Sequence, residues 1–331
     1  MIRRVLLSVI NSSHPQRGLL QAFTGIFGPE NVREYDFMEE VRRGKTIEAI
    51  NQIFAKVAND WRPDWIYLQV QDSEILRSES VLAIRSALPK CVVTHWTGDL
   101  RPAVSPYLSS FCKATHLTLI SSVGQIPMFK EAGAKEVRYY QIAVDWDEDI
   151  QGIPVWSPPF RVPEVVLCGH YYGATFPGTR DRELAIAALM EAKVDVGVVG
   201  NGWPKSYPTV GSCHVKQQHH VWRRAKVGLN VNHFGNISRY YSDRQLIVMA
   251  SGTALVCQYV PGLEEEFQNG IHCCWYKTTG ELVDIVKKLL ADEDMRKRVG
   301  SSGRAEVTKN HTWFERIFNV LPDVERIQSR L

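Results

Sequence analysis

The stretch RYYSDRQLIVMASGTALVCQYVPGLEEEF, residues 239–267, contains a complete helix–turn–strand unit. Ser242 or Asp243 can cap a short helix with the body QLIVMA, and Gly252 ends that helix. The run TALVC that follows is apolar on both faces, as is typical of a buried parallel strand. This stretch therefore predicts an α/β fold in which helices alternate with parallel strands.

Arg244 is unusual because it places a cation in the first turn of this helix, where the helix dipole disfavours positive charge. Arg239 lies just upstream, with Tyr241 between the two arginines. An anion such as a phosphate, bound at the helix N-terminus, would explain both cations. The alternative interpretation is that Asp243 neutralises Arg244 and that both are ordinary surface residues.

The same alternation of strands and helices runs through the whole chain. Buried strands are predicted at 5–10, 65–70, 91–96, 116–122, 137–145, 165–169 and 194–200. Helices are predicted at 45–60, 78–87, 125–133, 180–192 and 293–309. The segment 145–164 is acidic and then proline-rich, which is a linker composition. We therefore predict two Rossmann-like domains, 1–155 and 160–311, with the last helix at 312–331 packing back on the first domain.

Composition is that of a soluble globular protein, with 44% apolar and 23% charged residues in a chain of 331. The formal net charge is +3, and the excess lies in the second half, because residues 1–155 hold 17 basic and 18 acidic residues. Seven cysteines lack the paired spacing of a metal site and read as buried free thiols. No run approaches the roughly 18–20 apolar residues of a membrane span, and the N-terminus does not resemble a signal peptide. The expected location is the cytoplasm.

Glycine-bearing loops follow several predicted strands of the second domain. They are GHYYGATFPG, which contains Gly173, GNGWP, which contains Gly200, and NHFGN. Because ligands of open α/β sheets bind beyond the carboxyl ends of the strands, these loops indicate a nucleotide or dinucleotide site. No GxGxxG follows the first strand and no Walker lysine motif is present, so neither NAD nor P-loop chemistry is supported.

The second half of the chain resembles the C-terminal domain of group 1 glycosyltransferases with the GT-B fold, and in particular their spore-maturation-type (CgeB-like) branch. The resemblance rests on Arg244, the turn Met-Ala-Ser-Gly at 249–252, the loop Pro-Gly-Leu-Glu-Glu at 261–265 and the pair His311-Thr312. Upstream, AKVGLNVNHFG (225–235), VGNGW (199–203) and VVTHWTGDLRP (92–102) are also similar to that family. The resemblance implies two Rossmann-like domains that face each other across a cleft.

By the same resemblance, the second domain holds a nucleoside-diphosphate sugar and the first holds the acceptor. Arg244 and Arg239 would take the diphosphate, assisted by the helix N-terminus at Ser242 and Asp243. The remaining residues expected at the donor are Tyr241, Lys216, Gly173, Gly200, Asn201, Trp203, Asn232, His233, Glu264 and Glu265. UDP is favoured over GDP as the nucleotide, and no metal or other cofactor is expected.

One departure from the family concerns the catalytic machinery. Many relatives carry a glutamate two residues before the helix methionine and another eight positions earlier, where this chain has Ile247 and Arg239. A retaining mechanism therefore cannot be carried over. For an inverting displacement the first domain must supply a general base, and Asp99 is the first candidate, followed by His14 and His95. For Asp99 the alternative is a turn or helix cap, and for His14 a structural loop residue.

The sequence thus predicts a hexosyltransferase that moves a sugar from a nucleotide sugar to an acceptor hydroxyl without a metal. The acceptor is open: a saccharide, a lipid-linked intermediate, a protein or a modified DNA base would each fit. A nucleotide-sugar epimerase on the same fold, which needs no acceptor, and a GT-B scaffold that binds without catalysis are the alternatives. The oligomeric state does not follow from the sequence.

Overall fold

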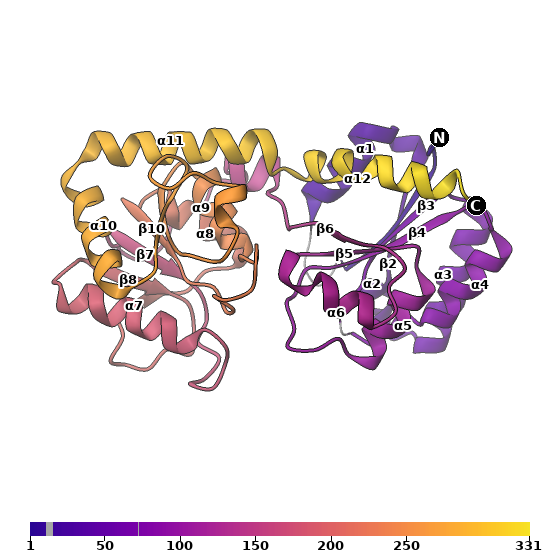
Figure 1. Cartoon of the computed structure of the whole chain (residues 1–331), viewed down its shortest axis with the longest axis horizontal. Coiled ribbons are helices and arrows are strands. Elements are labelled where there is room, and N and C mark those ends of the chain that lie inside the picture. Colours follow the sequence, from indigo (N-terminus) through magenta and orange to yellow (C-terminus); the bar gives the residue numbers. More distant parts are fainter. Residues whose placement is uncertain (11–15, 72) are drawn as a thin grey trace. The chain divides into compact units, whose positions relative to one another are not determined.

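The structure, a computed structural model, describes residues 1–10, 16–71 and 73–331, and it divides the chain into two compact units. Unit 1 comprises Met1–Ile142 together with Trp313–Leu331, and unit 2 comprises Ala143–Thr312. Figure 1 shows both units, each with a sheet covered by helices. The predicted pair of Rossmann-like α/β sheets is confirmed, because each unit contains a parallel sheet of six strands.

Unit 1 has the strand order β2-β1-β3-β4-β5-β6. Its strands are β1 (Val5–Val9), β2 (Val32–Asp36), β3 (Trp65–Gln69), β4 (Val92–Thr97), β5 (Leu117–Ile120) and β6 (Val137–Tyr139). Its helices are α1 (Arg17–Phe27), α2 (Phe37–Arg42), α3 (Ile47–Trp61), α4 (Ser78–Ala87), α5 (Pro106–Ala114), α6 (Ile126–Glu131) and α12 (Trp313–Gln328). Every residue of β1, β3 and β4 is buried, as expected for parallel strands with helices on both faces.

Unit 2 has the strand order β12-β11-β10-β7-β8-β9. Its strands are β7 (Val165–Cys168), β8 (Val196–Val199), β9 (Thr209–Gly211), β10 (Val227–Asn230), β11 (Ala254–Gln258) and β12 (Cys274–Tyr276). Its helices are α7 (Thr179–Glu191), α8 (Gln218–Trp222), α9 (Asp243–Ala250), α10 (Thr279–Ala291) and α11 (Glu293–Asn310). No helix in the described part of the chain is long and apolar enough to cross a bilayer.

The stretch 239–267 folds as its pattern predicts. Helix α9 begins at Asp243, Gly252 has a left-handed φ of +80° after the helix, and β11 follows at Ala254–Gln258. Strand β11 pairs in parallel with β10 on one side and β12 on the other. The two sides of α9 pack on β11 and α11, so all of its residues from Gln245 to Ala250 are buried.

The segment 145–164, whose composition suggested a linker, belongs to unit 2 instead. Trp146–Gln151 forms a helical turn that packs against α9. Arg223 and Arg304 both donate to the Ile150 carbonyl oxygen at 2.8 Å, and the Ile150 side chain is buried. These contacts hold the backbone of the turn in place. An acidic linker surrounded by water would lack them.

Helix α12 completes unit 1, although it is the last element of the chain. It packs against α1 and β4, and Figure 1 shows α12 (yellow) beside α1 (indigo). Trp313 stands edge-on to Trp96 of β4 with ring centroids 5.4 Å apart. At the start of the helix, Arg316 donates from Nε to the Gln141 carbonyl oxygen at 3.1 Å. The expected return of the C-terminal helix to the first domain is therefore seen within this unit.

We predict that α12 contributes to the stability of unit 1 through its buried face. Ile317→Ala removes a side chain with no exposure and should lower the free energy of unfolding by about 2–4 kcal/mol, measured by urea denaturation. The matched control is Phe318→Ala on the same helix, because the Phe318 side chain is 57% exposed and its loss should cost less than about 0.5 kcal/mol. Equal losses for the two variants would contradict the assignment of α12 to this core.

Candidate functional site

The topology of unit 2 places its ligand crevice at one position of the sheet. Strands β7 and β10 are neighbours in the sheet. From β7 the chain continues to β8 on one side of this pair, and from β10 it continues to β11 on the opposite side. In open α/β sheets the loops at such a switch point separate and create a binding crevice at the carboxyl ends of the strands. Here the two loops are 169–178, after β7, and 231–242, after β10.

These two loops touch each other through the start of α7. Gly178 has a φ of +74°, and a Cβ atom at this position would collide with the carbonyl oxygen of Asn232 and lie 2.6 Å from the His233 Cα atom. Only glycine permits both the backbone conformation and the close approach. The first turn of α7 is thereby held against the loop that follows β10.

Arg182, in that first turn, is the central cation of the site, and the sequence interpretation missed it. Its side chain is buried, with 3% exposure. Its guanidinium donates to the carbonyl oxygens of Val231 (3.2 Å) and His170 (3.4 Å) and contacts Nε2 of His233 at 3.3 Å. No carboxylate within the described ranges forms an ion pair with it. Three of its five N–H donors are thus used, and two remain for a ligand.

His233 orients this guanidinium and is not itself positively charged at neutral pH. Burial, and then the charges of Arg182 and Arg244, lower the His233 pKa to about 4. Its Nδ1 lies 3.0 Å from the Pro177 carbonyl oxygen. Because a carbonyl oxygen only accepts, Nδ1 carries the proton and Nε2 accepts from Arg182. His233 was predicted to face the nucleoside, whereas these contacts make it a positioning residue for Arg182.

Arg244 brings a second cation to the same place. Burial, and next the charge of Arg244, lower the pKa of Arg182 to about 9, which leaves Arg182 charged at neutral pH. Arg244 itself is 3.7 Å from Oδ1 of Asp243, which also accepts from the Arg244 backbone N–H at 2.9 Å. Asp243 therefore does pair with Arg244, as the alternative interpretation held, whereas Arg182 has no carboxylate partner among the described residues. The cluster of Arg182 and Arg244 keeps a net positive charge at the N-terminus of α9.

Amide and hydroxyl groups fix that N-terminus on the end of β10. The Ser242 backbone N–H donates to Oδ1 of Asn232 at 3.1 Å, and Oγ of Ser242 donates to Oδ1 of Asn230 at 3.0 Å. Asn230 in turn donates to Oδ1 of Asn232 at 3.1 Å. Asn232 is fully buried, and its Nδ2 has no hydrogen-bond partner in the part of the chain that the structure describes. Ser242 thus anchors α9 and does not cap it with its side chain.

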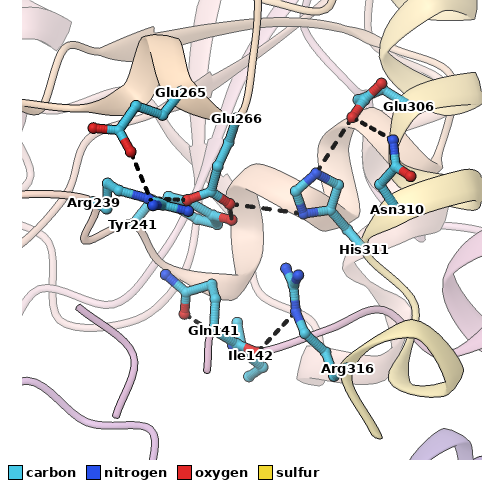
Figure 2. Close-up of polar contacts among 10 residues, drawn as sticks. All are labelled: Gln141, Ile142, Arg239, Tyr241, Glu265, Glu266, Glu306, Asn310, His311 and Arg316. Atoms are coloured by element: carbon cyan, nitrogen blue, oxygen red, sulfur yellow. Dashed lines mark hydrogen bonds and ion pairs between the residues drawn. The ribbon is translucent and has the colours of Figure 1, made fainter. Parts of the chain in front are cut away.

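Arg239 belongs to a different cluster from Arg244. Figure 2 shows Arg239 between two glutamates, with Nε 2.9 Å from Glu266 and a terminal nitrogen 3.0 Å from Glu265. Tyr241, which is buried, donates from its hydroxyl to Glu266 at 2.7 Å. These ion pairs satisfy Arg239 within the protein. The prediction that it shares the diphosphate with Arg244 consequently has no support from its contacts.

The remaining predicted donor residues have the following contacts. Lys216 forms an ion pair with Glu148 at 2.6 Å, and the exposed Glu264 accepts from the Tyr259 hydroxyl at 3.2 Å. The loop after β8 contacts the loop after β7 through hydrogen bonds or close approaches of four residues, Gly200, Asn201, Gly202 and Trp203. Gly173 has a φ of +104° and open space around it. Gly200 and Gly202 are thus needed for the close packing of the two loops, and Gly173 for its left-handed backbone conformation.

The candidate bases of unit 1 differ in accessibility. The Asp99 side chain follows β4, is 67% exposed and lies 3.6 Å from Arg101. His95 lies within β4, is fully buried, and contacts Oγ1 of Thr115 at 2.8 Å. Burial lowers the His95 pKa to about 3. His95 is therefore a core residue, which corrects its prediction as a base. His14 lies outside the described residues.

The arrangement of the two sheets identifies the fold. Two parallel Rossmann-like sheets, with the last helix returned to the first unit, make up the GT-B fold of glycosyltransferases. Residues 180–321 match the family model described as "Glycosyl transferase-like". No curated protein has significant similarity to the sequence.

Solved glycosyltransferase structures match nearly the whole chain. One is Alr3699/HepE of Anabaena, solved in complex with UDP and glucose, with 11% identity and a TM-score of 0.64 over 98% of this chain and 100% of that one. The same protein, with UDP-glucose, matches with 12% identity and a TM-score of 0.61 over all of both chains. A glycosyltransferase of Rickettsia africae ESF-5 matches with 10% identity and a TM-score of 0.66 over all of both chains. These matches confirm the predicted GT-B fold; the CgeB-like branch stays a prediction.

Glu306 of α11 predicts a specific pH dependence. The interaction with His311, whose Nε2 lies 3.7 Å from the Glu306 carboxylate, is the main cause that lowers the Glu306 pKa from 4.5 to about 2. Asn310 also donates to Glu306 at 2.8 Å (Figure 2). A lowered folded-state pKa contributes stability that is full above the unfolded pKa, near 4.5, and is lost as the pH falls toward 2.

The measurement is urea unfolding of the wild type and Glu306→Gln between pH 7 and pH 3. The wild type should be the more stable protein by a constant margin from pH 7 to about 5, and this margin should shrink as the pH falls below 4.5. The control is Glu264→Gln, because Glu264 is exposed and should show no such trend. A margin that grew on acidification would contradict the assignment.

Proposed function

We propose that this protein is a glycosyltransferase that binds a nucleoside-diphosphate sugar in unit 2 and transfers the hexosyl group to an acceptor hydroxyl. The observation that carries the proposal is the buried Arg182, which has no carboxylate partner in the described part of the chain and lies beside Arg244 at the switch point of the sheet. Buried charges are normally paired, and a diphosphate is the anion that would complete this site.

The same cations would also assist the reaction. When the bond between the sugar and the diphosphate breaks, negative charge develops on the leaving phosphate. Arg182, Arg244 and the positive end of the α9 dipole would stabilise that charge without a metal ion. His233 holds Arg182 in place and keeps its own proton on Nδ1. Metal independence is part of this proposal, and full activity in the presence of EDTA is its test.

UDP is the nucleotide we propose, because the structurally similar HepE of Anabaena was solved with UDP and with UDP-glucose. The acceptor would bind in unit 1, where Asp99 is the exposed carboxylate at the end of β4 and would act as general base. We infer no acceptor class from unit 1. The location in the cytoplasm remains the expectation from the sequence.

We predict that Arg244→Gln weakens UDP binding about ten- to hundredfold, since it removes a charge-assisted hydrogen bond to phosphate. In a thermal-shift assay the UDP-dependent rise in Tm of the wild type should largely disappear. The matched control is Arg180→Gln in the first turn of α7, because the Arg180 side chain is 76% exposed and contacts Glu183. An unchanged UDP shift in Arg244→Gln, or an equal loss in Arg180→Gln, would remove Arg244 from the phosphate site.

Catalysis is tested separately through Asp99. With UDP-glucose and a panel of saccharide, lipid-linked, peptide and modified-DNA acceptors, UDP release identifies the acceptor. Asp99→Asn should then lower kcat by about 10²–10⁴-fold and leave the Kd for UDP unchanged. UDP release that needs no acceptor would favour hydrolysis, and conversion of the sugar without UDP release would favour the epimerase. A variant with undiminished kcat would exclude Asp99 as the base.

A further inference from the structure

Two aromatic side chains remain exposed in the loop after β7, directly beside the proposed phosphate site. The Tyr172 side chain is 58% exposed and the Phe176 side chain 39%. The loop turns back on itself, with the Phe176 N–H donating to the Gly173 carbonyl oxygen at 3.1 Å. The Thr179 N–H, at the start of α7, donates to the Phe176 carbonyl oxygen at 3.1 Å. The two rings are thus presented by a closed, hydrogen-bonded turn.

The rings pack on the histidine that orients Arg182. Phe176 and His233 meet edge to face with centroids 4.9 Å apart, and Tyr172 lies 6.3 Å from His233. Tyr172 and Phe176 are themselves 4.9 Å apart and inclined by 44°. Since Nε2 of His233 is 3.3 Å from the Arg182 guanidinium, one imidazole ring separates the aromatic pair from the buried cation.

This arrangement matches the chemistry of a sugar phosphate. The charged part of such a ligand would bind Arg182 and Arg244, and one of the two sugars bonded to the diphosphate, the hexose or the ribose, would reach the rings beside His233. A pyranose has an apolar face of C–H groups, which aromatic side chains cover well. The ribose separates the nucleobase from the diphosphate. Because Tyr172 and Phe176 lie close to the cations, the nucleobase would lie beyond these two rings.

We propose that Tyr172 and Phe176 form a stacking platform for the transferred hexose of the nucleotide sugar. This inference rests on the proposed function and adds the residues that recognise the sugar. It predicts that the platform contributes to binding of UDP-glucose and contributes nothing to binding of UDP.

The test compares the Kd values of UDP and UDP-glucose, measured by titration calorimetry. The double variant Tyr172→Ala/Phe176→Ala should bind UDP-glucose about tenfold more weakly, while its Kd for UDP should change less than twofold. Tyr172→Phe keeps the ring and should retain UDP-glucose binding. The control Met190→Ala removes another exposed apolar side chain, from the last turn of α7, and should change neither Kd.

Each other outcome overturns the inference in a distinguishable way. An equal loss of UDP and UDP-glucose binding would place the nucleoside on the rings, and an unchanged Kd for UDP-glucose would remove the rings from the site. If the wild-type protein bound neither ligand, the proposed function would fail together with the inference. Unchanged thermal unfolding of the unliganded double variant verifies that the turn at Gly173 still folds.

Discussion

A buried guanidinium, Arg182, with no carboxylate partner among the described residues is the constraint around which unit 2 is organised. Removing the Arg182 charge from water costs several kcal/mol unless other groups compensate. The compensation comes from the carbonyl oxygens of His170 and Val231, which follow β7 and β10. One side chain therefore joins the two loops that the sheet topology separates. These carbonyl groups carry only partial charges, and no carboxylate of the described residues forms an ion pair with Arg182.

Several cations of unit 2 have carboxylate partners, whereas Arg223 and Arg304, like Arg182, donate to backbone carbonyl oxygens. Arg239 has two glutamates, Lys216 has Glu148, and Arg161 has Asp195. Each of these cations is neutralised by a partner of the same unit and holds a loop or strand in place. The overall net charge of +3 conceals this distinction. What distinguishes Arg182 from these cations is its position between the loops after β7 and β10, beside Arg244.

Local sequence patterns predicted much of the fold because each pattern states a physical requirement. Helix α9 and strand β11 were predicted from a capped apolar run, a glycine that ends it and a second apolar run. Arg244 was recognised as unusual because a cation in the first turn opposes the helix dipole. Helix α5, with the sequence PYLSSFCKA, was not predicted. Strand β12, with three residues, was too short to recognise.

The site itself was only partly predictable, since it depends on contacts between distant segments. In the sequence TRDREL, nothing local distinguishes Arg180 from Arg182. The orientation of α7 about its own axis buries Arg182 and exposes Arg180. His95 appeared to be a candidate base because it stands near a strand end. Strand β4, however, is buried on both faces, so alternation along it never brings a side chain to water.

The departure from the resembling family at residue 247 can be understood in the same physical terms. Ile247 is almost completely buried in α9 and offers no oxygen atom, so the glutamate that many relatives carry there has no substitute at that position. What the site offers instead are donors: two N–H groups of Arg182, the Arg244 guanidinium and Nδ2 of Asn232. Unsatisfied buried donors cost about 1–3 kcal/mol each, and an anion satisfies several of them together. A ligand whose phosphates accept hydrogen bonds from these donors can bind without a carboxylate at residue 247. Its sugar would then have to be recognised by residues outside α9.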